Sequence, residues 1–177
     1  MPIRTQFKGI FMCGIVGFKV NRNFDRLRNS LSEATSRLVH RGPNDSGFFF
    51  DETHGLGLGH RRLSVIDLSE AGRQPMASDD GRFQIVYNGE VYNFRVIRKT
   101  LEGLGHVFRT DTDTEVVLNA YRQWGIDCLK RFTGMFSFGL WDEKDECLFL
   151  ARDRLGFKPL FYYYAPETLF FGSELKA

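Results

Sequence analysis

The stretch Met12-Cys13-Gly14-Ile15-Val16-Gly17-Phe18-Lys19-Val20 places a cysteine directly before an apolar run, close to the amino end of the chain. The run from Ile15 to Val20 predicts a buried β-strand. If the residues before it are removed, or if translation starts at Met12 and that methionine is cleaved, Cys13 carries a free α-amine beside its own thiol. A nucleophile and a base then share one residue. A lone cysteine is more often a small buried hydrophobe, so the rest of the chain has to decide its role.

Length and composition predict a single globular domain of ordinary type. The chain has 177 residues, of which 42% are hydrophobic and 26% charged. Its 18 phenylalanines favour a core built from aromatic layers, as between two stacked sheets. The net charge is +2 and no Lys/Arg cluster is dense enough for a nucleic-acid surface. No apolar run is long enough for a transmembrane helix.

The three cysteines, Cys13, Cys128 and Cys147, are widely spaced and include no CxxC pair. They predict no zinc site and no disulfide framework, and free thiols favour a cytoplasmic protein. Residues 1–12 lack the apolar segment of a secretory signal. We expect them to be an N-terminal extension, either a start assigned too early or a propeptide, and residues 13–177 to be the folded domain.

The order of predicted elements is rich in strands and does not alternate between strand and helix. Strands are predicted at Cys13–Val20, Gly47–Asp51, Leu56–Arg61, Phe83–Tyr87, Gly134–Trp141, Cys147–Arg152, Leu160–Tyr164 and Thr168–Phe171. Helices are predicted at Phe24–Val39, Phe94–Leu104 and Glu115–Trp124, the last capped by Thr112 or Asp113. This order argues against a doubly wound parallel sheet and favours two facing sheets with helices outside.

The segment Asn88-Gly89-Glu90 is predicted to break the strand that precedes it. A sharp turn there leaves the glycine N–H pointing outward beside an asparagine amide. Two neutral donors that converge on one point form an oxyanion hole. An ordinary Asn-Gly turn is the simpler interpretation of the dipeptide by itself.

Charged residues supply two further candidates. Arg62, at a predicted strand end, could grip a carboxylate, although most such arginines are solvated. Asp113 and Glu115 lie at a helix start, where the helix dipole alone favours acids. A dyad of Cys13 with His40 or His60 stays open as a minor alternative. Thiol, oxyanion hole, cation and acids together suit a zwitterionic amino acid that has a reactive side-chain carbonyl.

Ordered motifs over residues 12–177 carry a family resemblance. They include Met-Cys-Gly-Ile at 12–15, His-Arg-Gly-Pro at 40–43, Arg-Leu-Ser-Val-Ile-Asp at 62–67, Gln-Pro-Met at 74–76, Tyr-Asn-Gly-Glu-Val-Tyr-Asn at 87–93, Thr-Asp-Thr-Glu-Val at 112–116 and Ser-Glu-Leu-Lys-Ala at 173–177. The chain resembles the N-terminal glutaminase domain of glutamine-hydrolysing asparagine synthetases. That domain is a class II glutamine amidotransferase and an N-terminal nucleophile hydrolase.

The resemblance implies an α+β fold, a four-layer αββα sandwich of two mainly antiparallel sheets flanked by helices. It also implies the site. Cys13 is similar to the nucleophile, and Asn88 and Gly89 to the oxyanion hole. The implied substrate-binding residues are Arg62 for the α-carboxylate, Glu90 and Asp113 near the α-ammonium, and the backbone of Leu63, Ser64, Val65 and Ile66. Asn44 stands where the family usually has aspartate, which changes the charge beside the pocket.

The implied reaction is hydrolysis of the glutamine side-chain amide through a cysteine thioester. Its ammonia would serve the ATP-dependent conversion of aspartate to asparagine in a C-terminal synthetase domain that these residues do not include. The resemblance implies no metal or cofactor in this domain, ATP and Mg²⁺ in the synthetase domain, and no nucleic-acid or membrane partner. A homodimer is left open. Two alternatives remain: a related amidotransferase that acts on another carboxylate, or a non-catalytic regulatory domain if Cys13 is never freed.

Overall fold

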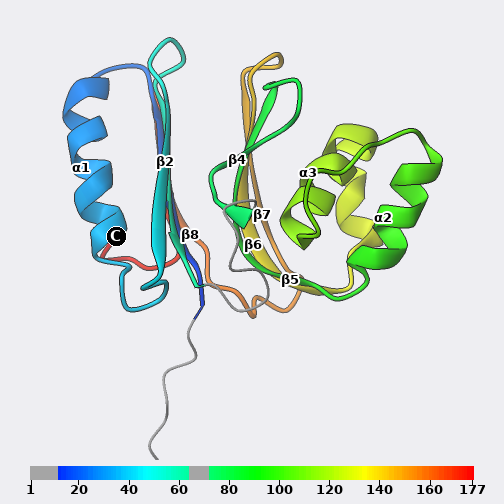
Figure 1. The fold of residues 1–177 in the computed structure, drawn as a ribbon. Coiled ribbons are helices and arrows are strands. Elements are labelled where there is room, and N and C mark those ends of the chain that lie inside the picture. The colour runs from blue at the N-terminus through cyan, green and yellow to red at the C-terminus, as the bar shows by residue number, and fades with distance from the viewer. Residues whose placement is uncertain (1–11, 64–71) are drawn as a thin grey trace, which may run out of the picture.

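Two antiparallel β-sheets face each other, and helices cover their outer surfaces (Figure 1). The computed structural model describes residues 12–63 and 72–177. Sheet A has the strand order β2 (Asp45–Asp51), β3 (Leu56–Arg62), β1 (Gly14–Val20), β9 (Thr168–Gly172) and β8 (Phe161–Ala165). Sheet B has the order β4 (Met76–Ala77), β5 (Phe83–Val91), β6 (Gly134–Asp142) and β7 (Cys147–Arg152). The predicted αββα sandwich is confirmed.

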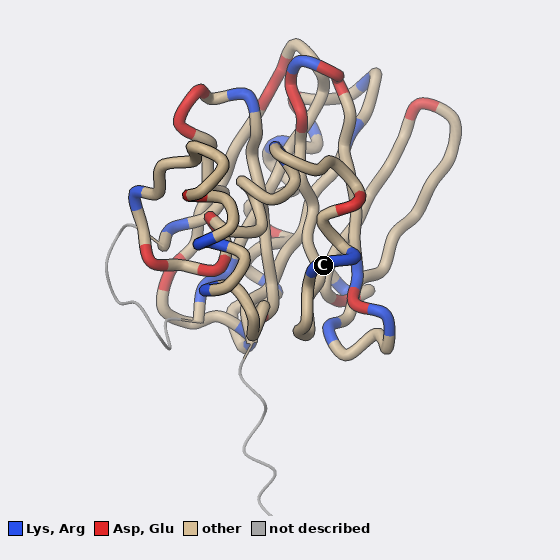
Figure 2. The backbone as a smooth tube through the Cα atoms, turned by 90° about the vertical axis from the view of Figure 1, so that its right-hand side faces the viewer, with Lys and Arg blue, Asp and Glu red and all other residues tan. Residues whose placement is uncertain are grey.

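The helices lie on opposite outer faces of the sandwich, α1 (Phe24–Ser36) on sheet A and α2 (Phe94–Gly103) with α3 (Asp113–Trp124) on sheet B (Figure 1). A 3₁₀ segment, η2 (Gly125–Arg131), follows α3. Thr112 is the cap of α3, because its hydroxyl accepts the Glu115 N–H at 3.4 Å. None of the described helices is long and apolar enough to cross a membrane. Acidic and basic positions are interspersed along the described backbone (Figure 2).

The layer between the sheets is apolar. Side chains alternate along a strand, so every second residue of β3 and β1 points toward sheet B. The layer comprises Ile15, Leu56, Leu58, Val86, Trp141 and Phe171, each at most 3% exposed. A second apolar cluster packs sheet B against α2 and α3 and includes Phe83, Phe132, Phe136 and Phe138. Most of the buried phenylalanines therefore lie between a sheet and its helices. The layer between the two sheets, where they were predicted, has one of them, Phe171, among the described residues.

Strand β5 continues through the segment predicted to end it. It runs from Phe83 to Val91, and Asn88 and Gly89 pair with Ser137 and Phe136 of β6. The prediction of a turn at Asn88-Gly89 was therefore wrong. A Cβ on Gly89 would lie 2.4 Å from the Met135 carbonyl oxygen, so glycine serves a close approach between strands. A glycine after an asparagine indicates a turn, but Gly89 is also the residue that a tight contact between strands requires, so the sequence alone does not separate the two.

Strand β1 occupies the middle of sheet A and fixes which ends of the strands meet. Gly14 pairs with Arg61 near the end of β3, and Val16 pairs with Gly172 at the end of β9. Cys13, one residue before β1, therefore lies at the same end of sheet A as Leu63. In Figure 1 the blue start of β1 marks this end at the bottom of the sheet.

The helix-side core of sheet B gives a stability prediction. Leu140 is fully buried, whereas Leu155 is 81% exposed. Leu140→Ala should lower the free energy of unfolding by about 2–5 kcal/mol, because it removes buried methyl groups and leaves a cavity. The matched variant Leu155→Ala should change that free energy by less than about 0.5 kcal/mol. Urea denaturation measures both, and equal losses would contradict the packing described here.

Candidate active site

Cys13 is held at the start of β1 by both its thiol and its backbone. The sulfur accepts the Leu63 N–H at 3.4 Å and donates to the Leu63 carbonyl oxygen at 3.9 Å. The Cys13 carbonyl oxygen accepts a hydrogen bond from Arg41 Nε at 3.1 Å. Arg41 is itself buried, and its Nη1 contacts Glu174 Oε1 at 3.2 Å. The position of the sulfur is thus set by two segments, residues 41 and 63.

Burial raises the pKa of the Cys13 thiol, because the thiolate loses hydration. The Leu63 N–H and the positive charges of Arg62, Lys158 and Arg41 act in the opposite direction and only partly offset this rise of the pKa. The thiol is therefore protonated at neutral pH. Attack by its sulfur requires a base to remove the proton. The charges of Arg62, Lys158 and Arg41 would then stabilise the thiolate.

Arg62 ends β3 and is 9% exposed. Its backbone carbonyl accepts the Asn44 N–H at 3.1 Å, so the residue at the unusual asparagine position anchors this strand end through its main chain. A Cβ on Gly72 would lie 2.6 Å from Arg62 Nη2. The guanidinium occupies the space that a larger residue at position 72 would fill, on the face of β3 that looks toward sheet B.

The amide of Asn88 is buried on the inner face of sheet B. Asn88 is 1% exposed, and its Nδ2 has no hydrogen-bond partner among the described residues. The hydroxyl of Ser137, on the paired position of β6, is also buried without a partner there. Buried donors are rarely left unpaired in folded proteins, so an unpaired amide points to a ligand.

The backbone N–H of Gly89 faces the edge of β5 that β6 does not cover. Alternate N–H groups of a strand point to the same side. The N–H groups of the flanking residues Tyr87 and Val91 donate to Gln74 Oε1 at 2.6 Å and to Asp113 Oδ2 at 3.0 Å, respectively. The Gly89 N–H lies between these two side chains, at the open edge next to the Asn88 amide.

Tyr87 links the acidic residues to this edge. Its hydroxyl donates to Asp113 Oδ2 at 2.8 Å. Burial raises the pKa of Tyr87 well above its usual value, and the charges of Asp113, Glu90 and Cys13 raise it further. Burial also raises the pKa of Asp113. The predicted residues Cys13, Asp113 and Glu90 therefore share one electrostatic neighbourhood with Tyr87.

The structure brings most of the predicted site residues together. Cys13, Arg62, Leu63, Asn88, Gly89, Glu90 and Asp113 gather at the same end of the sandwich. The predicted backbone contacts of Ser64, Val65 and Ile66 fall outside the described residues. Glu115 is structural, since its carboxylate accepts the N–H groups of Arg109 and Thr110.

The minor alternative of a cysteine–histidine dyad receives no support from the described contacts. The Cys13 sulfur contacts the backbone of Leu63. His40 Nε2 pairs with Glu174 Oε1 at 2.8 Å, and His60 Nε2 donates to the Tyr87 carbonyl oxygen at 3.3 Å. Both imidazoles are therefore engaged elsewhere.

Sequence reasoning missed the residues that hold the site in place. Arg41 and Gln74 stand in motifs that carried the resemblance, yet no role followed from the motifs. His60 had a usable signal, because it continues the inward-facing series of Leu56 and Leu58 on β3. Lys158 also stands in such a motif, Lys-Pro-Leu at 158–160. No role followed from it, and its Nζ donates to Met12 Sδ at 3.0 Å across 146 positions of sequence.

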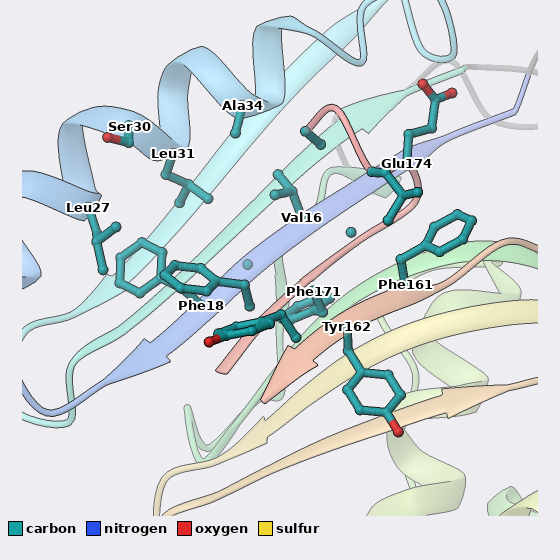
Figure 3. Close-up of a pocket in the computed structure, with 16 residues that line it drawn as sticks. Val16, Phe18, Leu27, Ser30, Leu31, Ala34, Phe161, Tyr162, Phe171 and Glu174 are labelled. Carbon is teal, nitrogen blue, oxygen red and sulfur yellow. The ribbon is translucent and has the colours of Figure 1, made fainter. Parts of the chain in front are cut away.

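A cavity of about 290 Å³ lies on the outer face of sheet A, between α1 and the strands β8 and β9 (Figure 3). Val16, Phe18, Leu27, Leu31 and Phe161 line it. Among its described lining residues only Glu174 is charged. Val16 and Phe18 point to the opposite face of β1 from Cys13 and Ile15. This cavity is therefore separate from the thiol.

The family model of the glutamine amidotransferase domain matches residues 12–177. This chain belongs to the glutamine amidotransferase domain family. Asparagine synthetase (glutamine-hydrolysing) 3 of Bacillus subtilis is 43% identical over 169 residues, which cover 94% of this chain and 27% of that protein. Amidase chry2 of Gibberella zeae is 34% identical over 176 residues, covering 94% of this chain and 26% of its own length.

A solved structure supports the fold of this amidotransferase domain. The glutamine phosphoribosylpyrophosphate amidotransferase of B. subtilis, complexed with ADP and GMP, superposes with a TM-score of 0.71 at 20% identity. The match covers 92% of this chain and 42% of that one. The amidotransferase domain thus shares its two-sheet fold with part of that protein.

Residues 12–63 and 72–177 of the amidotransferase domain contain no group of three or more His, Cys, Asp or Glu side chains arranged to hold a metal ion. The three cysteines are all free thiols.

His60 gives the amidotransferase domain a pH-dependent stability. Burial lowers the pKa of His60 to about 3. An unfolded histidine titrates near pH 6.5, so the unfolded chain takes up this proton first as the pH falls. Stability from neutral His60 is complete above about pH 6.5 and should decrease by about 2 kcal/mol on lowering the pH to 5. Urea denaturation at pH 7 and pH 5 should show this loss in the wild type and not in His60→Gln. An equal pH dependence in both proteins would refute it.

Proposed function

We propose that this domain hydrolyses the side-chain amide of glutamine through a thioester on Cys13 and delivers the ammonia to a synthetase domain of the same protein. The observation that carries the proposal is the unpaired, buried Nδ2 of Asn88 next to the open-edge N–H of Gly89. Two neutral donors at one point, opposite a fixed thiol, suit the negative oxygen of a tetrahedral intermediate.

The chemistry begins with a proton transfer within Cys13. Once Met12 is removed, the α-amine, with an ordinary pKa of about 7.7–8.0, can accept the proton of a thiol with an ordinary pKa of about 8.5. The thiolate attacks the amide carbon, and the carbonyl oxygen becomes an oxyanion between Asn88 and Gly89. The α-ammonium returns its proton to the amide nitrogen, which leaves as ammonia. Water then hydrolyses the thioester to glutamate.

The position of Lys158 suits the proposed role of the Cys13 α-amine as a base. Its Nζ contacts the Met12 sulfur, and the charge of Cys13 affects its pKa, so the ammonium lies close to the Met12–Cys13 bond. A nearby positive charge disfavours protonation of a second amine. Lys158 would therefore keep the freed Cys13 α-amine in its neutral, basic form.

Recognition of the substrate would use the charges around the thiol. Arg62 suits the α-carboxylate, because a guanidinium can bind both carboxylate oxygens. Asp113 and Glu90 suit the α-ammonium, together with the backbone of Leu63 and of residues 64–66. Burial raises the pKa of Asp113, and an ammonium bound beside it would favour its ionised form.

The proposed acceptor of the ammonia would bind to the synthetase domain and not to these residues. The chain spans 27% of the length of the B. subtilis asparagine synthetase that it resembles, which supports aspartate as the acceptor and a synthetase domain that uses ATP and Mg²⁺. A second candidate is an amidotransferase that acts on another carboxylate, because one relative of 34% identity is named an amidase and not an asparagine synthetase. Three free thiols agree with a cytoplasmic protein.

Loss of an oxyanion donor tests the proposed role of Asn88. Asn88→Ala should lower kcat for ammonia release from glutamine by about 10²–10³-fold, because the donor acts mainly in the transition state. KM should change little. Steady-state kinetics with glutamine measure both constants, and Asn119→Ala, on α3, serves as the control. A rise in KM at unchanged kcat would remove Asn88 from the oxyanion hole.

Release of Cys13 tests the proposal as a whole. Protein whose intact mass begins at Cys13 should release ammonia from glutamine and become alkylated at Cys13 by a glutamine-like electrophile such as 6-diazo-5-oxo-L-norleucine. Protein that retains residues 1–12 should do neither, because its Cys13 nitrogen is an amide, and Cys13→Ala should be inactive. Activity in either of these two proteins would overturn the mechanism.

A further inference from the structure

We infer that His60 is a positioning residue, which holds the Asn88–Gly89 oxyanion hole of sheet B at its working distance from Cys13 of sheet A. The inference rests on the proposed function and deepens it. It assigns a role to a buried histidine that takes no part in the proton transfers described above.

The hydrogen bond of His60 crosses from one sheet to the other. His60 lies on β3, where it pairs with Ile15, two residues after Cys13. Its Nε2 donates to the Tyr87 carbonyl oxygen of β5 at 3.3 Å, and Asn88 follows directly. The side chain is 1% exposed. One bond thus connects the strand next to the nucleophile with the residue before the oxyanion donors.

The imidazole is a permanent donor. A carbonyl oxygen can only accept, so the proton resides on Nε2. Burial lowers the pKa of His60 to about 3, and the charges of Arg62 and Arg61 also disfavour a second proton. The ring therefore keeps one proton on Nε2 throughout the pH range in which a glutaminase works, which suits a fixed strut and excludes an acid–base role.

A hydrogen bond to the Tyr87 carbonyl can set the position of Asn88. This carbonyl shares a rigid peptide plane with the N–H and Cα of Asn88, so a tilt of this plane displaces the Cα that carries the Asn88 side chain. The Gly89 N–H belongs to the next peptide plane, which begins at the same Cα. Gln74 fixes the Tyr87 N–H, and Asp113 fixes its hydroxyl. Of these three partners, His60 is the one that belongs to sheet A. Leucine at this position would fill the apolar layer equally well, yet it would leave the carbonyl unpaired.

The test compares three variants in protein that begins at Cys13. His60→Leu removes the donor and should lower kcat by about a hundredfold, the cost of a small misplacement of reacting groups. His60→Gln keeps a donor at similar reach and should stay within a few-fold of wild type. His54→Leu is the matched control, since it removes a histidine whose Nε2 lies 3.7 Å from Glu146 across the sheets at the other end of the sandwich. Its kcat should be unchanged.

Two binding measurements separate positioning from general damage. His60→Leu should bind L-glutamate γ-semialdehyde, which forms a tetrahedral adduct with the thiol, less tightly by the same factor as its kcat falls. Its affinity for L-glutamate and its rate of alkylation by iodoacetamide should match the wild type. Thermal unfolding identifies a variant that does not fold, in which case His60→Asn, whose shorter side chain falls short of the carbonyl, replaces His60→Leu.

The outcomes are distinct. Equal kcat in all variants, or an equal loss in His60→Leu and His60→Gln, overturns the positioning role while the proposed function stands. So does a parallel loss of glutamate affinity or of alkylation rate. Wild-type protein beginning at Cys13 that releases no ammonia, or an active Cys13→Ala, overturns the proposed function and the inference with it.

Discussion

The apolar layer between the two sheets is the constraint on which the site depends. Trp141 and Leu58 in this layer are fully buried, and Asn88 on the same inner face of sheet B is 1% exposed. In such a layer every polar group needs a partner, because its lost hydration is not replaced. Tyr87 has partners for its N–H, carbonyl and hydroxyl groups. The Asn88 Nδ2 has none among the described residues. The Ser137 hydroxyl and Trp141 Nε1 share this state, and Asn88 is set apart by the neighbouring open-edge N–H of Gly89.

The same constraint explains the electrostatics around the thiol. Burial raises the pKa of Cys13, while three cations from separate segments, at residues 41, 62 and 158, oppose the rise. The electrostatic potential at the Cys13 sulfur is therefore positive, yet the thiol keeps its proton. In the proposed mechanism this thiol stays inert until its own nitrogen becomes a free amine, which the proposed removal of Met12 would create. The fold can be complete before the chemistry is possible.

Much of the fold could be predicted because it follows from local signals. The strand β3 and the cap at Thr112 are properties of short segments, and both predictions are confirmed. The end of β5 was predicted wrongly, since Asn-Gly is a turn signal and the close approach of Gly89 to Met135 is decided by the neighbouring strand. For the site, Cys13, Arg62 and Asn88 were named through motifs. The roles of His60, Gln74 and Lys158 were not, because their contacts with Tyr87 and Met12 join segments that only the fold brings together.

The place of β1 in the middle of sheet A has a consequence for the order in which the protein is made. One edge of β1 pairs with β3, but the other pairs with β9, and the Ile15 N–H donates to Ser173 Oγ, 158 positions away. At ordinary ribosomal speeds of about 5–20 residues per second, the second edge has to wait roughly 8–30 seconds for its partner to be synthesised. Cys13, the proposed nucleophile, thus leaves the ribosome before the other residues of the candidate site and is among the last of them to be enclosed. In a nascent chain interrupted before Gly172, β1 lacks part of its pairing with β9, and Cys13 lies at the end of an incomplete sheet. Translation of the whole domain therefore has to precede assembly of the site.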